Sequence, residues 1–319
     1  MIIHKMYVPH SSLAPIALFV YNRPWHAKQT LESLEKNYLS DQSVLYIFAD
    51  GAKSTADQDS LNRIAEVRKI IREKQWCKEV HIIESEQNKG LANSIIGGVS
   101  QLISEFGKVI VLEDDMLTSP FFLQFMNEAL DFYANEERVA SVHAYIFDIE
   151  DLPNTFFLKD PGCWGWATWA RSWRLFEHDG KKLMKEIQKK KLIKRFDYDN
   201  SYPYFLMLKK QVKGENDSWA IRWYASLFLK DKLTLYPHQS LVYNIGNDAS
   251  GTHAIGEEDY FEVKVAQKAI HVGEIPIEAN RMVYQKIVKF FQTHFPKPSS
   301  RRRLKNKVLS WIKYLKSAL

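Results

Sequence analysis

Cysteine and long apolar runs are both scarce in this sequence, and each shortage excludes a class of protein. The chain has two cysteines, Cys77 and Cys163, in 319 residues. They are too few for a disulfide framework and lack metal-ligand spacing, so we expect a reducing compartment. No run reaches the roughly 18 apolar residues of a membrane-spanning helix, and residues 1–10 lack the apolar core of a secretory signal. We therefore expect a cytoplasmic protein.

Acidic residues are absent from residues 296–319, which hold eight lysines and arginines. Because the whole chain carries a net charge of +6, removing those eight leaves −2 for the rest. The body is therefore not basic, which argues against binding to nucleic acid. Apolar residues of this tail recur at helical spacing, at Leu304, Val308, Ile312, Leu315 and Leu319. A basic amphipathic helix is typical of a membrane-surface element, although a helix packed on the body or a disordered tail would fit as well.

Four apolar segments of strand length alternate with helical patterns up to about residue 134. The segments are continuous apolar runs, which is typical of strands buried on both faces of a mostly parallel sheet. The predicted strands span 15–21, 43–51, 79–85 and 108–113, and the predicted helices span 25–38, 57–75, 88–104 and 121–133. We therefore expect an α/β domain flanked by helices.

Polar residues follow three of these predicted strands. Asn22-Arg23 follows the first strand, Asp50-Gly51 the second, and Glu113, Asp114 and Asp115 end the fourth. Ligands of open α/β sheets bind beyond the carboxyl ends of the strands. The sequence therefore predicts a ligand site built from these residues.

The pattern loosens after about residue 135. A further strand is predicted at 141–147, a charged helix at 181–196, a helix at 218–231 and a loop at 246–259. Residues 161–176 contain four tryptophans. We expect these rings mainly in the core, with Trp164 and Trp166, beside Gly162 and Gly165, as candidates for contact with an acceptor.

The three adjacent carboxylates repel one another, so they need a cation or a solvated position. Oxygen ligands suit Mg²⁺ or Mn²⁺, which commonly share their coordination with a phosphate. Ser119 and Pro120 have the residue types of an N-cap and a first helical position, so the cluster is expected in a short loop before a helix. Taken alone, the cluster could also be a solvated acidic turn.

The order of these motifs is more specific than any one of them. A strand ending in Asn-Arg-Pro, a strand ending in Asp-Gly, the loop at 88–92 and Val-Leu-Glu-Asp-Asp follow in turn. This resembles the nucleotide-sugar-binding half of GT-A fold glycosyltransferases, in particular the N-acetylglucosaminyltransferase I-related and family 2-like bacterial enzymes. The resemblance continues at 161–173, 216–223 and 249–253.

The resemblance implies a GT-A fold, with a Rossmann-like, mostly parallel sheet, and a division of the chain. Residues 1–13 would be an N-terminal extension and 14–150 the nucleotide-sugar-binding half. Residues 151–260 would hold the acceptor and the catalytic base. A helical segment at 261–295 and the basic tail at 296–319 would follow.

The resemblance also assigns roles to single residues. Asp115 would contact Mn²⁺ or Mg²⁺ bridging the donor diphosphate, and Glu113 and Asp114 would lie against the ribose or the sugar. Asp50 would accept a hydrogen bond from uracil, and Arg23 would reach the nucleotide or its phosphates. Further expected contacts are Asn88, Lys89 and Asn93 in the nucleotide pocket, Asp217 as the catalytic base and His253 at the metal or the diphosphate.

These roles make chemical sense together. A metal and a cation would stabilise the negative charge that builds on the departing nucleotide diphosphate. A carboxylate would take the proton of the attacking hydroxyl. Because a base and a leaving-group clamp must flank the reacting carbon in a single displacement, inversion at the anomeric carbon is expected. Plainer alternatives are an N-cap for Asp217, a simple turn for Asp50-Gly51, and surface positions for Arg23 and His253.

The predicted function is thus metal-dependent, inverting transfer of a sugar from a UDP-sugar to a hydroxyl of a glycan, with N-acetylglucosamine or a related hexose as the best guess. Bacterial surface polysaccharide synthesis, with a lipid-linked acceptor at the inner face of the membrane, would suit the basic tail. Departures from the family pattern are Tyr21-Asn22 before Arg23, where an acidic residue is common, and Asn216 beside Asp217. The alternatives are a sugar nucleotidyltransferase, disfavoured because 15–25 has no glycine, a glycosidase, and a non-catalytic binding protein.

Overall fold

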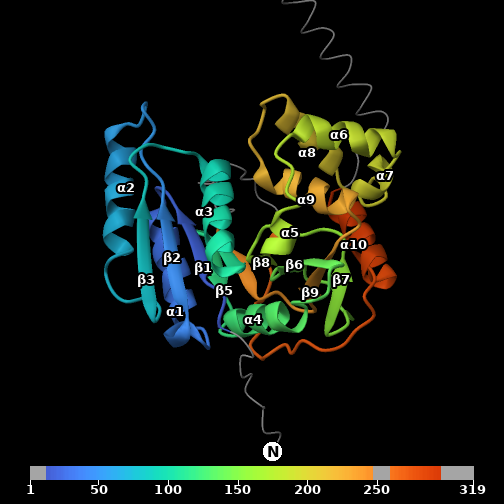
Figure 1. The fold of residues 1–319 in the computed structure, drawn as a ribbon, viewed down its shortest axis with the longest axis horizontal. Helices are drawn as coiled ribbons and strands as arrows, with labels where there is room; N and C mark the ends of the chain where they lie inside the picture. The colour runs from blue at the N-terminus through green and yellow to red at the C-terminus, as the bar shows by residue number, and fades with distance from the viewer. Residues whose placement is uncertain (1–11, 247–258, 296–319) are drawn as a thin grey trace, which may run out of the picture.

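An eight-stranded sheet lies at the centre of the computed structural model, which describes residues 12–246 and 259–295 (Figure 1). Helices cover both faces of this sheet, so the predicted α/β class is confirmed. In spatial order the strands are β3 (Glu79–Glu84), β2 (Val44–Ala49), β1 (Ile16–Val20), β4 (Lys108–Glu113), β8 (Trp166–Trp169), β6 (Val139–His143), β9 (Leu233–Pro237) and β7 (Thr155–Leu158).

The four strands predicted in the first half of the chain form the parallel half of the sheet. β1 pairs in parallel with β2 on one side and β4 on the other, and β2 pairs with β3. Successive residues of a strand point to opposite faces. Ile16 and Leu18 therefore pack into one hydrophobic core and Ala17 and Phe19 into another. Burial on both faces explains why the strand is a continuous apolar run.

Helices of the first half fill these two cores from opposite sides. Leu31 of α1 and Val67 of α2 pack in the core of Ile16 and Leu18, whereas Ile95 and Val99 of α3 pack with Phe19. α1 begins at Pro24, whose missing N–H suits a first helical position. These helices are α1 (Pro24–Glu35), α2 (Gln58–Ile70), α3 (Leu91–Phe106) and α4 (Phe122–Phe132).

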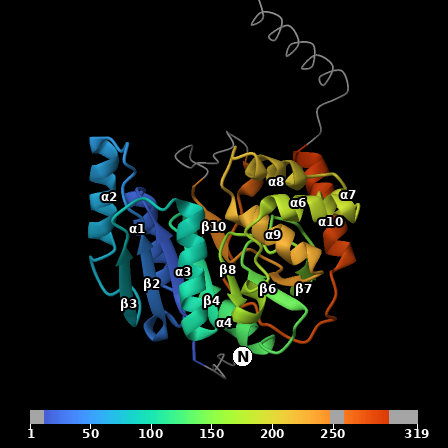
Figure 2. The same cartoon turned by 45° about the horizontal axis from the view of Figure 1, so that its top comes forward.

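The second half of the chain extends the sheet with mixed strand directions. β8 is antiparallel to both β4 and β6, and β9 is parallel to β6 and antiparallel to β7. Most of its helices lie above this half of the sheet in Figure 2. They are α5 (Ala170–Trp173), α6 (Gly180–Lys189), α7 (Ile193–Phe196), α8 (Tyr204–Val212), α9 (Trp219–Leu229) and α10 (Arg281–His294), and the 3₁₀ turns are η1 (Ser40–Gln42) and η2 (Asp259–Phe261).

These pairings bring the carboxyl ends of six strands, β1, β2, β3, β4, β6 and β9, to one edge of the sheet. The chain moves outward from β1 to β2 and β3, and then returns to the other side of β1 with β4. The strand order therefore reverses between β1 and β4. Such a reversal point is where open α/β sheets bind their ligands.

The structure corrects the predicted bounds of three elements: the helix at 181–196, the strand at 141–147 and the helix at 121–133. The charged helix predicted at 181–196 is two helices, α6 and α7, separated where Lys191 adopts a left-handed conformation with φ of 57°. The predicted strand at 141–147 is β6, which ends at His143. α4 begins at Phe122, and Ser119 is not its N-cap. A short strand, β5 (Met116–Thr118), follows the acidic cluster instead and pairs with β10 (Val242–Asn244).

Four tryptophans, Trp166, Trp173, Trp219 and Trp223, form a cluster of rings in the core on the α3 side of the sheet. The ring centroid of Trp166 lies 5.2 Å from that of Trp219 and 5.9 Å from that of Trp173. Trp166 has no exposed surface, so the prediction that it contacts an acceptor is wrong. Trp164 is half-buried, and its ring packs edge-on against that of Tyr145 with 4.7 Å between the ring centroids.

Four predicted features lie wholly or largely outside the described residues. They are the N-terminal extension at 1–13, the loop at 246–259, His253 and the amphipathic helix of the tail at 296–319. Among residues 12–246 and 259–295, no helix combines the length and the apolar character needed to cross a membrane.

Candidate functional site

The point where the strand order reverses carries an arginine and three carboxylates. Arg23 follows β1, and Glu113, Asp114 and Asp115 end β4 and begin the turn to β5. Nη1 of Arg23 donates to Oδ2 of Asp115 at 2.7 Å and lies 3.7 Å from Oδ1 of Asp114. Residues that lie some 90 positions apart in the sequence thus meet because β1 and β4 are neighbours.

Asp114 is fixed by its surroundings and nearly buried, with 8% of its surface exposed. Its backbone carbonyl accepts a hydrogen bond from the Thr30 hydroxyl at 2.9 Å, and Oδ2 accepts one from the backbone N–H of Tyr21 at 3.4 Å. Burial and then the Asp115 charge raise the pKa of Asp114 to about 7, although Arg23 opposes this shift. Burial raises the pKa of Glu113 as well, and the charges of Asp115 and Asp114 raise it further. With Arg23 as the cation beside it, the cluster therefore resists full ionisation, which a bound metal cation would favour.

Asp115 has one carboxylate oxygen available for a cation. Oδ2 accepts from Arg23, whereas Oδ1 is buried and has no hydrogen-bond partner within the described part of the chain. A buried carboxylate oxygen without a donor is unfavourable unless something else binds it. No three side chains of His, Cys, Asp or Glu in that part gather as a metal site. The residues therefore fit a metal that takes one protein carboxylate and draws its other ligands from phosphate and water, as Mg²⁺ commonly does.

Gly246, two residues after the end of β10, leaves room for this carboxylate. The backbone N–H of the preceding Ile245 donates to the Asp115 carbonyl at 2.9 Å. A Cβ atom at position 246 would overlap Oδ2 of Asp115 and lie 3.0 Å from Nη2 of Arg23. The glycine therefore lets the chain pass directly over the Arg23–Asp115 pair.

We expect Gly246→Ala to displace the Asp115 carboxylate and to weaken Mn²⁺-dependent nucleotide binding by about tenfold or more, because moving a ligating group by about 1 Å is costly. Isothermal titration of the nucleotide in Mn²⁺ measures the effect. The matched control is Gly97→Ala on α3, where an added Cβ meets open space and only a gain of about 1 kcal/mol in helix stability is expected. Equal nucleotide affinity in the two variants would contradict this account of Gly246.

Asp50 holds the loop before α3 to the end of β2. Oδ1 accepts hydrogen bonds from the backbone N–H groups of Gly51 at 2.9 Å and Lys89 at 2.8 Å. Oδ2 accepts from the N–H of Gly90 at 2.9 Å and from Nδ2 of Asn88 at 3.0 Å. Four donors therefore already surround the carboxylate that the sequence assigned to uracil.

The other predicted nucleotide contacts belong to this same loop. Nδ2 of Asn88 also donates to the Gly51 carbonyl at 2.9 Å, and Nδ2 of the exposed Asn93 donates to the Lys89 carbonyl at 2.9 Å. Gly51 has no room for a side chain, because an added Cβ would overlap the backbone of Gln87. The structure thus brings Asp50, Asn88 and Lys89 together as one braced turn at the carboxyl edge of the sheet.

Asp217, the predicted base, lies at the start of α9 with 69% of its side chain exposed. Oδ1 accepts a hydrogen bond from Nη2 of Arg222 at 3.2 Å. The N-cap of α9 is the next residue, Ser218, whose hydroxyl accepts from the N–H of Ile221 at 3.2 Å. The capping alternative for Asp217 is therefore wrong, and its role as base stays a prediction.

One carboxylate close to the acidic cluster was not predicted. Asp160 precedes Gly162 and Cys163 in the segment between β7 and β8. Burial raises the pKa of the Cys163 thiol, and the charges of Glu113, Asp160 and Asp115 raise it further. β8 pairs with β4 so that Trp166 lies opposite Val111, and the segment that leads from Asp160 into β8 therefore lies beside the end of β4, where the acidic cluster follows. The only sequence signal was that Asp160 directly precedes the Pro-Gly that begins the tryptophan-containing motif at 161–173.

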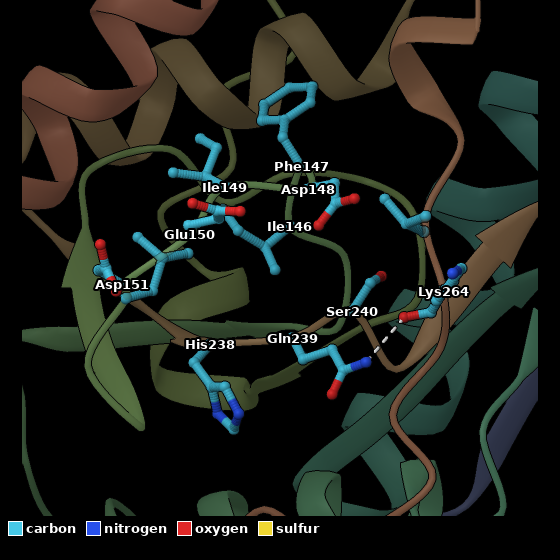
Figure 3. A pocket seen from close by; sticks show the side chains of 12 residues that line it. Ile146, Phe147, Asp148, Ile149, Glu150, Asp151, His238, Gln239, Ser240 and Lys264 are labelled. Carbon is cyan, nitrogen blue, oxygen red and sulfur yellow. Dashed lines mark hydrogen bonds between the residues drawn. The ribbon is translucent and has the colours of Figure 1, made fainter.

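A pocket of about 320 Å³ lies at the same edge of the sheet, beyond the ends of β6 and β9 (Figure 3). The side chains of Asp148 and Glu150 face those of Ser240 and Gln239 across it, and Nε2 of Gln239 donates to the Lys264 carbonyl at 3.1 Å. Apolar side chains between β6 and β7 line much of the rest, together with Asp151, His238 and Val263. Its volume and mixed lining suit a small polar molecule.

No family model matches the chain, and no curated protein matches its sequence. Solved structures of similar fold include the galactosyltransferase LgtC in complex with donor and acceptor sugar analogues, at 10% identity and a TM-score of 0.37, covering 90% of this chain and 99% of that one. Another is the mannosyltransferase PcManGT from Pyrobaculum calidifontis in complex with GDP-Man and Mn²⁺, at 15% identity and a TM-score of 0.28. That match covers 43% of this chain and 37% of the mannosyltransferase.

A UDP-glucose pyrophosphorylase complexed with UDP-glucose is also similar, at 12% identity and a TM-score of 0.34, covering 72% of this chain and 93% of that one. The mannosyltransferase and the pyrophosphorylase are in complex with a nucleotide sugar, and the galactosyltransferase with donor and acceptor sugar analogues. The likeness is one of fold alone, and the chemistry proposed below depends on the residues of this chain.

Proposed function

We propose that the protein is a metal-dependent glycosyltransferase that moves a sugar from a nucleotide diphosphate sugar to a hydroxyl group. The observation that carries this proposal is the arrangement of Arg23 and Asp115. They form an ion pair where the strand order reverses, and Oδ1 of Asp115 is buried without a donor in the described residues. A cation beside an available carboxylate oxygen suits a metal-bound diphosphate.

In this proposal each group at the β1–β4 end has one task. Arg23 would donate to the diphosphate as negative charge builds on it. Asp115 would hold the metal through Oδ1. When bound, a divalent metal supplies positive charge that stabilises the departing nucleotide diphosphate. Glu113 and Asp114 would face the sugar and ribose hydroxyls, which can donate to their carboxylates.

The donor is proposed to be a UDP-sugar, with N-acetylglucosamine or a related hexose transferred. Asp50, with Asn88 and Lys89, would act chiefly by shaping the turn against which the base and ribose rest, because four donors occupy its carboxylate. His253 at the diphosphate and Asn93 at the nucleotide remain proposals. A base and the metal on opposite sides of the reacting carbon would invert the anomeric centre.

The acceptor is proposed to be a glycan, reached along Trp164 and the pocket of Figure 3. Trp164 is half-buried, and a partly exposed indole ring offers an apolar face and an N–H to a sugar. A lipid-linked glycan at the inner face of the membrane, contacted by the basic tail, is the proposed setting.

The proposal is tested by thermal melting of the wild-type protein with UDP-sugars, GDP-sugars and free UDP, each with Mn²⁺ and with EDTA. A ligand that binds the native state at about a hundred times its dissociation constant stabilises it by about 2.7 kcal/mol. We expect a rise in melting temperature with uridine nucleotides that requires Mn²⁺. No shift with any nucleotide would refute the proposed function.

A further inference from the structure

The segment between β7 and β8 holds Asp160 in one orientation. The backbone N–H of Gly162 donates to Oδ1 of Asp160 at 3.0 Å, and the Tyr236 hydroxyl donates to the Asp160 carbonyl at 2.7 Å. Further along, the backbone N–H of Trp164 donates to Nε2 of His143 at 3.2 Å. Burial lowers the pKa of His143 to about 3, so this ring stays neutral and accepts.

Gly162 makes this arrangement possible. Its φ of 60° lies in the left-handed region, and a Cβ at this position would overlap the His143 ring. A side chain would be strained there for both reasons. The loop is therefore built to fix Asp160 relative to the sheet.

The other oxygen of Asp160 is only weakly satisfied. Oδ2 lies 3.4 Å from the Tyr204 hydroxyl and 3.5 Å from the Tyr198 hydroxyl, longer than normal O–H···O bonds. Asp160 as a residue is half-buried. A carboxylate oxygen with long contacts has room to accept a shorter hydrogen bond from a ligand hydroxyl.

The groups around Asp160 do not neutralise its charge. Burial raises its pKa to about 6, and the bonds from Gly162, Tyr204 and Tyr198 oppose that rise. A base is most effective when its pKa lies close to the working pH. The titratable groups that face Asp160 are Cys163 on its own segment, Tyr198, Tyr202 and Tyr204 before and in α8, Tyr224 on α9 and Tyr236 on β9.

We propose that Asp160 is the catalytic base, and that the acceptor hydroxyl binds at its Oδ2 beside the hydroxyls of Tyr198 and Tyr204. This inference depends on the proposed function. The acceptor oxygen forms a bond to the anomeric carbon, the bond from that carbon to the diphosphate oxygen breaks, and the nucleotide diphosphate leaves with the electron pair. Oδ2 of Asp160 takes the acceptor proton.

Asp160 suits this role better than Asp217 on three grounds. Asp217 is 69% exposed, and its Oδ1 already accepts a hydrogen bond from Arg222. Asp160 is half-buried and lies in the segment that leads into β8 beside the end of β4, where the acidic cluster follows. Its orientation is fixed by the Gly162 N–H, whereas Asp217 caps nothing within α9.

Asp160→Asn should be folded and as stable as wild type. The folded-state pKa of about 6 lies above the ordinary value of 3.8, so the contribution of this group is fully present below about pH 3.8 and is lost as the pH rises through about 6. The charge is therefore unfavourable at neutral pH, and the asparagine variant should melt no lower than wild type at about pH 7.5. A clearly lower melting temperature would contradict the placement of Asp160, and Asp160→Ser would then serve in the kinetic test.

The kinetic test measures UDP release from the UDP-sugar that gives the largest melting shift, with Mn²⁺ and with water or a glycan as acceptor. We expect Asp160→Asn to bind UDP and Mn²⁺ as wild type does and to lose about a hundredfold or more in turnover. The acid limb of the wild-type pH profile, near pH 6, should disappear in the variant. Asp231→Asn, at a surface carboxylate with 76% of its side chain exposed, is the matched control and should keep wild-type turnover.

Azide separates a base from a structural role, because this nucleophile has no proton to lose. We expect azide to restore UDP release in Asp160→Asn and to form the glycosyl azide. Wild-type turnover in Asp160→Asn, an unchanged pH profile, or the same loss and azide rescue in Asp217→Asn alone would overturn the proposal for Asp160. Failure of the wild-type protein to bind UDP with Mn²⁺ would instead refute the proposed function.

Discussion

Asp115→Asn is expected to abolish the Mn²⁺-dependent part of nucleotide binding and to reduce turnover of the donor about a hundredfold or more. The amide that replaces the carboxylate is neutral, and half of it is a donor, so it neither holds a divalent cation nor balances Arg23. A metal contributes several kcal/mol to the stabilisation of the leaving group, and each 1.36 kcal/mol corresponds to a tenfold change in rate. Calorimetric titration of UDP in Mn²⁺, together with the rate of UDP release, measures both effects.

The fold should survive this change, because asparagine has nearly the same shape as aspartate and the backbone bond from Ile245 to Asp115 is untouched. Asp59→Asn is a matched control, since Asp59 pairs with Arg63 on the exposed face of α2 and surface pairs contribute about 1 kcal/mol or less. If Asp115→Asn bound UDP equally well with Mn²⁺ and with EDTA, as wild type does not, the assignment of the metal to Asp115 would be wrong.

Asp50→Asn is expected to lower the free energy of unfolding by about 3 kcal/mol and to weaken nucleotide binding. Hydrogen bonds to a charged group contribute about 1.5–3 kcal/mol, and donors left without an acceptor add a further penalty. The new amide group would face two N–H donors in either orientation, either those of Gly51 and Lys89 or those of Gly90 and Asn88. Denaturant unfolding gives the stability, and calorimetry gives the nucleotide affinity.

Asn93→Ala is a control for stability alone, and it tests whether the loss of stability belongs to Asp50 rather than to the loop in general. Asn93 donates to the same loop from an exposed position, so its removal should change stability by less than about 0.5 kcal/mol. A stable Asp50→Asn variant that loses only uridine nucleotides and keeps others would restore the original prediction of a uracil contact and contradict the bracing role.

The sequence predicts the first half of the fold well because burial on both faces leaves a plain signal. β1 to β4 are continuous apolar runs, and each predicted strand lies within two residues of the observed one at both ends. The second half is harder because its strands are short and depend on distant partners. β5 and β10 have three residues each and form a strand pair with each other. No local sequence pattern predicts either of them.

The candidate site shows the same division between local and distant information. Parallel neighbouring strands end at the same edge of the sheet, so polar residues after β1 and β4 were expected to meet there. Arg23 and Asp115 do form an ion pair. That Trp166 is buried follows from the packing of Trp219 and Trp173 around it, which the sequence could not supply. The sequence did not predict a role for Asp160, because the residues around it come from α8, α9 and β9, all far from it in the sequence.

The most direct measurement of the central claim is the rate of nucleotide release from UDP-sugars by the wild-type protein, with Mn²⁺ and with EDTA. We predict UDP release with Mn²⁺, its loss in EDTA and its loss in Asp115→Asn even when Mn²⁺ is present. Turnover that is the same in EDTA, or that persists in Asp115→Asn, would contradict the account of the site between β1 and β4.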